Sequence, residues 1–123
     1  MNALLSARRA YAQSAGPVRT PRGVEYEAFA RITRQLKSAG TTGSIRRLAP
    51  SIHDNRRLWT LLATDVADPN NSLPSELRAR IFYLAEFTQQ HSREVLRGKA
   101  NVDALVEINL SVMRGLRQTE DAS

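Results

Sequence analysis

The sequence predicts an all-α fold, an antiparallel bundle of four to five helices in a single domain spanning residues 1–123. Apolar residues recur at helical spacing along most of the chain, and no segment shows the alternation of β-branched and polar residues typical of strands. Short breaks rich in Gly, Pro and Asn separate the periodic segments. Amphipathic helices joined by short loops bury their apolar faces most simply by packing antiparallel.

The first two predicted helices cover residues 2–13 and about 21–38. The first is short and ends at a Gly-Pro pair, which stops a helix. Thr20 can cap the second helix, and Pro21 suits its first position because proline lacks only an N–H that would be unpaired there. The Gly- and Thr-rich segment 39–44 is predicted to be the loop that follows.

The third predicted helix begins near residues 50–51, after a separate short turn of helix at residues 44–49, and ends at an Asp-Pro-Asn-Asn sequence. A later start capped by Asp54 would place Arg56 and Arg57 in the first turn. The helix dipole would oppose each arginine there by roughly 0.3–1 kcal/mol. The charge pattern therefore predicts the earlier start.

Start and stop residues also mark the last two predicted helices. The fourth covers residues 72–97, with Pro74 in its first turn and Gly98 beyond its end. The fifth starts after Asn101, whose side chain can cap it. Residues 119–123 are predicted to be a frayed tail.

The net charge of +6 is concentrated in the first part of the chain. Residues 1–50 hold nine Lys/Arg against two acidic residues, whereas residues 51–123 hold nine against ten. A basic surface can attract nucleic acid, acidic lipid or an acidic protein. The sequence lacks helix-turn-helix spacing and a basic-aromatic stacking platform, so a protein partner or a solvated face is favoured over nucleic acid. It also lacks a signal peptide and a long apolar run, so we expect a cytoplasmic protein without a membrane span.

The sequence contains no recognisable catalytic or metal-binding constellation. Cysteine is absent, and neither His53 nor His91 has a second histidine at ligand spacing. The glycines of residues 40–44 lack the following Gly-Lys-Ser/Thr of a phosphate-binding loop. No nucleophile is paired with a base. We therefore expect no enzymatic activity, metal or cofactor.

Trp59 and Asn109 stand out as residues that could serve either the core or an interface. Trp59 lies at helical spacing with leucines, which is typical of a core anchor. Asn109 falls on the apolar face of the last helix, where an unpaired amide would be costly. It should therefore bond a neighbouring backbone group or face a partner peptide. Tyr11 and Tyr26 suit a core rim or an interface equally well.

Four short segments form an ordered series across nearly the whole chain. They are Thr20-Pro21-Arg22 with Glu25-Tyr26, then Asn55-Arg56-Arg57-Leu58-Trp59, then Asp65 with Asn70-Asn71-Ser72-Leu73-Pro74, and finally residues 106–116 with Asn109 and Gly115. In this order and spacing they resemble the FlaF family of flagellar biosynthesis proteins from alphaproteobacteria. Tyr11 and Thr20-Pro21 are also similar, more loosely, to FliS-type flagellin export chaperones.

The resemblance implies a cytoplasmic, non-enzymatic factor needed for flagellin synthesis and secretion, with flagellin and possibly FlbT as partners. Our hypothesis is that the bundle offers a hydrophobic groove to an amphipathic helical end of flagellin and so prevents premature polymerisation. The residues expected to contribute are Tyr11, Tyr26, Arg56, Arg57, Trp59 and Asn109. Two alternatives are a regulator that binds flagellin messenger RNA and a scaffold that holds FlbT.

Overall fold

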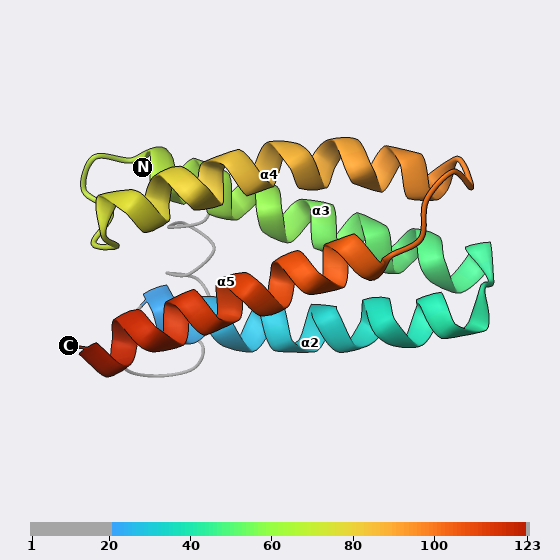
Figure 1. The fold of residues 1–123 in the computed structure, drawn as a ribbon, viewed down its shortest axis with the longest axis horizontal. Coiled ribbons are helices and arrows are strands. Elements are labelled where there is room, and N and C mark those ends of the chain that lie inside the picture. Colours follow the sequence, from blue (N-terminus) through green and yellow to red (C-terminus); the bar gives the residue numbers. More distant parts are fainter. Residues whose placement is uncertain (1–20, 123) are drawn as a thin grey trace.

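The computed structural model describes residues 21–122, with side chains described from residue 26 to residue 117. This part of the chain forms an antiparallel bundle of four long helices and contains no strand (Figure 1). The helices are α2 (Pro21–Thr42), α3 (Ile45–Ala67), α4 (Ser75–Leu96) and α5 (Asp103–Ala122). The all-α fold predicted from the sequence is confirmed. The helix predicted at residues 2–13 lies outside the described residues.

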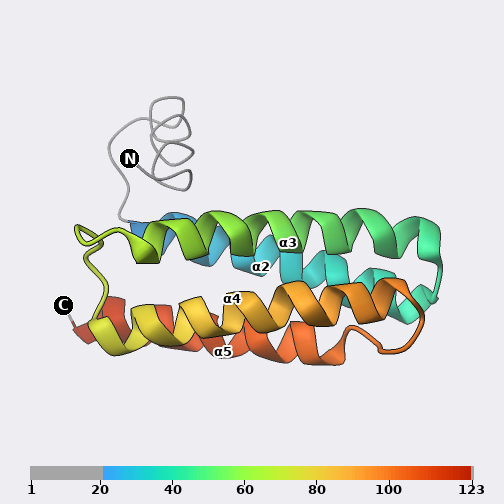
Figure 2. The ribbon, with the colours of Figure 1, turned by 90° about the horizontal axis from the view of Figure 1, so that it is seen from above.

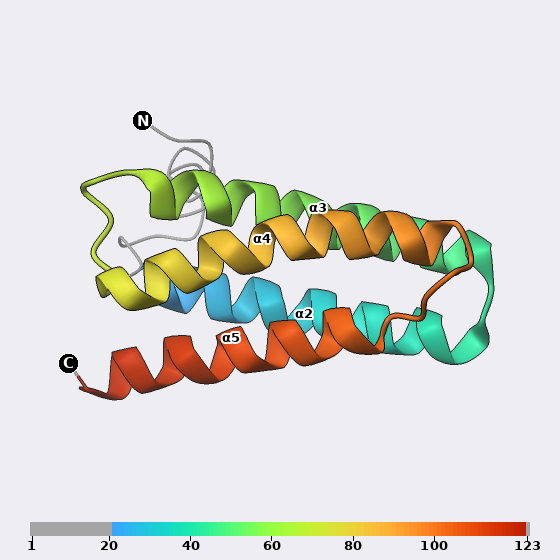
Figure 3. The same cartoon turned by 45° about the horizontal axis from the view of Figure 1, so that its top comes forward.

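The helices run along one long axis, with two connections at one end of the bundle and one at the other. The α2–α3 turn and the α4–α5 loop share an end, and the α3–α4 connection lies at the opposite end (Figure 2). Helix α2 packs against α3 and α5, and α3 packs against α4, whereas the α4–α5 contact is the slightest of the four (Figure 3). The paired loops at one end bring sequence-distant side chains together there.

The core consists of two apolar clusters. One surrounds Trp59 and Phe29 and draws residues from all four helices, including Ile81 and Val112. The other surrounds Leu36 and Ile52 and also includes Val95, Val102, Leu105 and Val106. Buried polar residues occupy the register between the two clusters on each helix. They are Thr33 on α2, Asn55 on α3, Thr88 and Ser92 on α4, and Asn109 on α5.

Helix α2 continues to Thr42, four residues beyond its predicted end, so most of the predicted loop is helical. The reason is tertiary contact. A Cβ placed on Gly40 would lie 2.5 Å from Cγ2 of Val102, so glycine here permits the start of α5 to pack closely on α2. The turn itself is made at Gly43, whose φ of 66° is one that glycine adopts without strain.

Helix α3 is one continuous helix from Ile45 and includes Pro50, so the predicted separate turn at residues 44–49 is wrong. Pro50 lacks an N–H and costs the helix one internal hydrogen bond. Because its side chain is exposed, water can reach the freed carbonyl of the preceding turn. The early start agrees with the dipole argument, since Arg56 and Arg57 lie well inside the helix.

The ends of α4 and α5 follow the predicted signals closely. Pro74 precedes α4 as its cap residue instead of lying in the first turn, and Gly98 ends the helix with a φ of 75°. The Asn101 side chain accepts a hydrogen bond from the Asp103 backbone N–H at 2.9 Å, as a capping residue does. Helix α5 continues to Ala122, past its predicted end, because its last residues include no proline or glycine to stop it.

Side chains fasten the α3–α4 connection to the helices on both sides. Asn71 donates a hydrogen bond from Nδ2 to Oδ2 of the buried Asp65 at 2.8 Å. Arg78, in the first turn of α4, donates to the backbone carbonyl of Val66 at 3.0 Å and to that of Asp68 at 2.9 Å. These carbonyls belong to the end of α3, where helical partners are missing. The segment from Asp65 through Asn71 therefore has a structural role.

Candidate partner-binding surfaces

Trp59 and Asn109 lie in the interior and bind each other. Trp59 donates from Nε1 to Oδ1 of Asn109 at 2.9 Å, and its ring meets Phe29 edge-on at 5.5 Å between centroids. The Asn109 amide donates from Nδ2 to Asn55 Oδ1 at 2.8 Å and to Thr33 Oγ1 at 3.1 Å. Trp59, Asn55 and Asn109 are all 0 % exposed. The predicted core role of Trp59 is confirmed, and the partners of Asn109 are side chains of α2 and α3.

Not every polar atom in this layer is satisfied. Within the described residues, Nδ2 of Asn55 and Oγ1 of Thr88 have no hydrogen-bond partner although both side chains are fully buried. Ser92, one turn further along α4, uses its hydroxyl on the Thr88 carbonyl at 2.6 Å. A buried polar group without a partner costs about 1–3 kcal/mol. The polar layer thus specifies how the helices pack at a cost in stability.

Arg56 and Arg57 lie on the outer side of α3, facing the seam with α4. Arg56 is half-buried, and its Nε donates to Oε1 of Gln89 at 2.8 Å. Gln89 returns hydrogen bonds from Nε2 to the Arg56 carbonyl at 3.1 Å and to Thr60 Oγ1 at 3.0 Å. Arg57 is exposed. Of the two arginines, Arg57 is therefore the freer to meet a partner, while Arg56 also joins α3 to α4.

The remaining predicted contributors lie elsewhere. Tyr26 is half-buried near the start of α2, and the guanidinium carbon of Arg117 lies 5.2 Å from the centre of its ring. This distance suits a cation–π contact between α2 and α5. Tyr11 lies outside the described residues. The described members of the predicted set therefore occupy three separate places: the interior, the α3–α4 seam and the α2–α5 seam.

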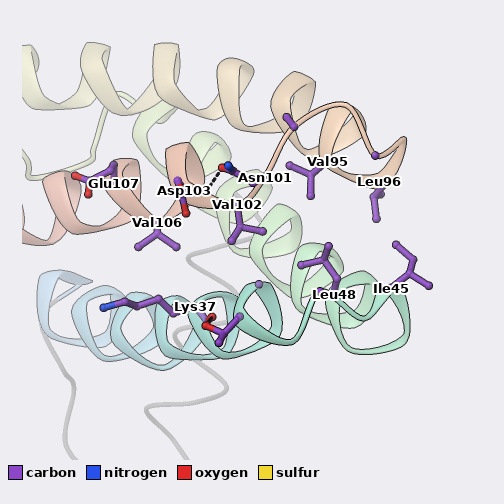
Figure 4. A pocket seen from close by; sticks show the side chains of 15 residues that line it. Lys37, Ile45, Leu48, Val95, Leu96, Asn101, Val102, Asp103, Val106 and Glu107 are labelled. Atoms are coloured by element: carbon purple, nitrogen blue, oxygen red, sulfur yellow. Dashed lines mark hydrogen bonds between the residues drawn. The ribbon is translucent and has the colours of Figure 1, made fainter.

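A pocket of about 770 Å³ lies at the end of the bundle where the α2–α3 turn and the α4–α5 loop meet (Figure 4). We call it the end pocket. Its apolar lining includes Leu48, Val95, Val102 and Val106, together with Ile45 and Leu96, which are 55 % and 38 % exposed. Lys37 of α2 and Asp103 and Glu107 of α5 add charged side chains to the lining. The combination of apolar surface and sparse charges is typical of a site for an amphipathic segment.

A second hollow, of about 330 Å³, lies along the α3–α4 seam. Ile52, Arg56, Arg57 and Gln89 line it, and so does Leu96, which the two hollows share. We call the two hollows together the Leu96 groove. Leu96 therefore lies beside the predicted arginines in the second hollow and beside Ile45 in the end pocket.

The aliphatic part of this groove is not among the contributors predicted from the sequence. Ile45 begins α3, and Leu96 ends α4. Apolar residues at helix ends fit the helical pattern as well as buried ones do, and their exposure depends on how far the neighbouring helices extend. For Ile45 and Leu96, the Gly-containing loops next to them are the only local sequence feature that indicates the end of the bundle.

Helix α4 also carries exposed aromatic side chains. Phe82, Tyr83 and Phe87 are 45 %, 69 % and 40 % exposed, so they lie outside the buried face of the helix. The buried positions of α4 are taken by smaller residues, which leave the phenylalanines at the edges of the helix. Phe87 stacks on His91 at 5.5 Å, and His91 Nε2 lies 3.2 Å from the Asn101 carbonyl oxygen.

Neither a metal-holding cluster nor a membrane-spanning helix is found in the described part of the chain. Among residues 21–122, no group of three or more His, Asp or Glu side chains is placed to hold a metal ion. None of the four helices is long and apolar enough to cross a bilayer. What the geometry does provide is exposed apolar surface with charges beside it, and surface of this kind marks interaction sites.

These features define a class of protein, a small all-α bundle with an apolar pocket at one end and a second hollow along the α3–α4 seam. The family model described as "Flagellar protein FlaF" matches residues 7–116, and the chain belongs to that family. It is therefore a flagellar protein. Comparison with curated proteins and with solved structures finds no match.

Proposed function

We propose that this FlaF-family protein is a non-enzymatic, cytoplasmic chaperone that binds flagellin and supports its synthesis and secretion. The observation that carries the proposal is the Leu96 groove, in which Ile45 and Leu96 line the end pocket and remain substantially exposed. Membership of a flagellar family points to a flagellar client. An amphipathic helical end of flagellin has the apolar face that such a groove would cover.

The groove would act by occlusion. Covering the exposed parts of Ile45 and Leu96 is worth about 2 kcal/mol in total, with further contributions from the rest of the client's contact surface. The client's apolar face would meanwhile be unable to associate with other flagellin copies. Arg57 and Arg56, at the edge of the groove, would orient the client and raise its association rate more than its affinity.

The other predicted contributors act differently in this proposal. Trp59 and Asn109 hold α2, α3 and α5 in register from the interior and do not touch the client. Tyr26 fastens α2 to α5 through Arg117.

The test is co-expression with flagellin and isolation of the complex. The double variant Ile45→Ser/Leu96→Ser removes the exposed aliphatic surface of the groove. Losing about 2 kcal/mol weakens binding about thirtyfold, so the variant should release flagellin during purification. Tyr83→Ser is the matched control, since Tyr83 is 69 % exposed and lines neither hollow.

Thermal melting followed by circular dichroism shows whether both variants are folded. A folded Ile45→Ser/Leu96→Ser variant that retains flagellin like the wild type contradicts the groove as the site. Recovery of RNA with the wild-type protein, and never of flagellin, contradicts the chaperone proposal as a whole. That outcome would favour an RNA-linked regulator of flagellin expression.

A further inference from the structure

A second groove, unlike the first in its chemistry, runs between α2 and α3. It has a volume of about 510 Å³, and the side chains of Arg31, Arg34 and Arg47 line it together with small and polar residues. It shares no lining residue with the Leu96 groove. All three arginines are exposed, and no acidic side chain lines the hollow within the described part of the chain. We call it the arginine groove.

The guanidinium groups in this groove have no carboxylate partner among residues 26–117. Arg47 donates from Nη2 to Ser38 Oγ at 3.4 Å, which holds its side chain against α2. Ser51 reaches across the groove to the Gln35 carbonyl at 3.5 Å and also bonds the Arg47 carbonyl at 3.2 Å. The walls are therefore linked to each other, while most of the N–H donors of the arginines face solvent.

The run of positive charge along the groove extends over only a short distance. On α2, Glu27 lies one helical turn before Arg31, and on α3, Asp54 lies one turn after Pro50. A long phosphodiester chain that continued past the groove in that direction would run toward these two acidic positions. A ligand whose negative charge spans no more than the length of about two helical turns would not reach those acidic positions.

The lining also distinguishes between anionic ligands. Bases of single-stranded RNA bind by stacking on aromatic side chains, and no aromatic residue lines this groove among those described. Guanidinium groups match both carboxylates and phosphates in a bidentate geometry, so it is the missing stacking surface that favours a carboxylate ligand. We propose that the arginine groove binds a short segment rich in Asp and Glu on a partner protein.

The proposal is independent of flagellin binding at the Leu96 groove, and its test uses defined probes. Fluorescence anisotropy measures binding of the full-length protein to a labelled oligoglutamate peptide and to an oligouridine of equal length. We expect oligoglutamate to bind more tightly. The variant Arg34→Gln/Arg47→Gln should weaken that binding by about fivefold, the range expected when two exposed charge pairs are lost.

The control is Arg93→Gln/Arg114→Gln, which removes the same charge from exposed positions on α4 and α5. It should change binding by less than about twofold if the groove, and not the net charge, is responsible. A second variant, Arg31→Gln/Arg34→Gln, leaves the Arg47–Ser38 bond intact and should weaken binding like the first. Tighter binding of oligouridine, equal losses in the groove and control variants, or no binding of oligoglutamate would each overturn the proposal.

Discussion

Replacing Asn109 with leucine should lower the free energy of unfolding by about 3 kcal/mol. Leucine has nearly the shape of asparagine, so packing changes little. The substitution does, however, remove the acceptor for Trp59 Nε1 and the donor to Asn55 Oδ1. Each buried group left unpaired costs about 1–3 kcal/mol, and the added apolar surface offsets part of that sum. Asn55 would suffer most, because its Nδ2 already has no partner within the described structure.

Urea denaturation followed by circular dichroism measures the loss as a shift in midpoint at unchanged slope. A double-mutant cycle with Trp59→Phe isolates the hydrogen bond between the two side chains. With the indole N–H gone, the loss caused by Asn109→Leu should shrink by about 1 kcal/mol or more. A cost below about 1 kcal/mol for Asn109→Leu alone, or strict additivity in the cycle, would refute the view that this network holds the core in register.

Four further substitutions test the packing and the end of α3. Gly40→Ala should destabilise the protein by about 1–3 kcal/mol in thermal melts, because its Cβ would collide with the stiff side chain of Val102. Gly115→Ala, whose Cβ would only touch Leu77 Cδ1 at 3.4 Å, should instead leave the stability unchanged or raise it by up to about 1 kcal/mol. Thr88→Val removes an unpaired buried hydroxyl at constant shape and should leave the urea midpoint unchanged or raise it. A clearly lower midpoint would show that the Thr88 hydroxyl does have a hydrogen-bond partner. Arg78→Met should cost about 2 kcal/mol by freeing two carbonyls at the end of α3, and no loss would argue against that role.

The parts of the fold that could be predicted are those set by residues acting on their own helix, without a contact distant in sequence. The stop at Gly98 and the cap at Asn101 could be predicted because each acts on its own helix end. Gly40 could not, because glycine at that position normally indicates a loop. Its reason for being in a helix is Val102, which is distant in sequence and adjacent only in the folded bundle. Pro50 led to the wrong prediction of a separate turn before it. A proline near the start of a helix costs little stability when the carbonyl that loses its hydrogen bond faces solvent.

The candidate site also combines features that local sequence predicts with features that depend on how the helices pack. The segment from Asn55 to Trp59 appears as one motif in the sequence, yet its ends point into the core and its two arginines lie at the surface. Helical periodicity places Trp59 and Asn109 on buried faces, but their mutual hydrogen bond depends on the register between α3 and α5. The Leu96 groove depends on where four helices end relative to one another, and local sequence patterns carry no such information.

The proposed function depends on flagellin binding through the Leu96 groove. Titration calorimetry of purified flagellin into the wild-type protein and into Ile45→Ser/Leu96→Ser tests it most directly. Binding through the groove predicts a one-to-one complex for the wild type and a Kd raised about thirtyfold in the folded variant. An unchanged Kd in that variant, or no complex with the wild type, would contradict it.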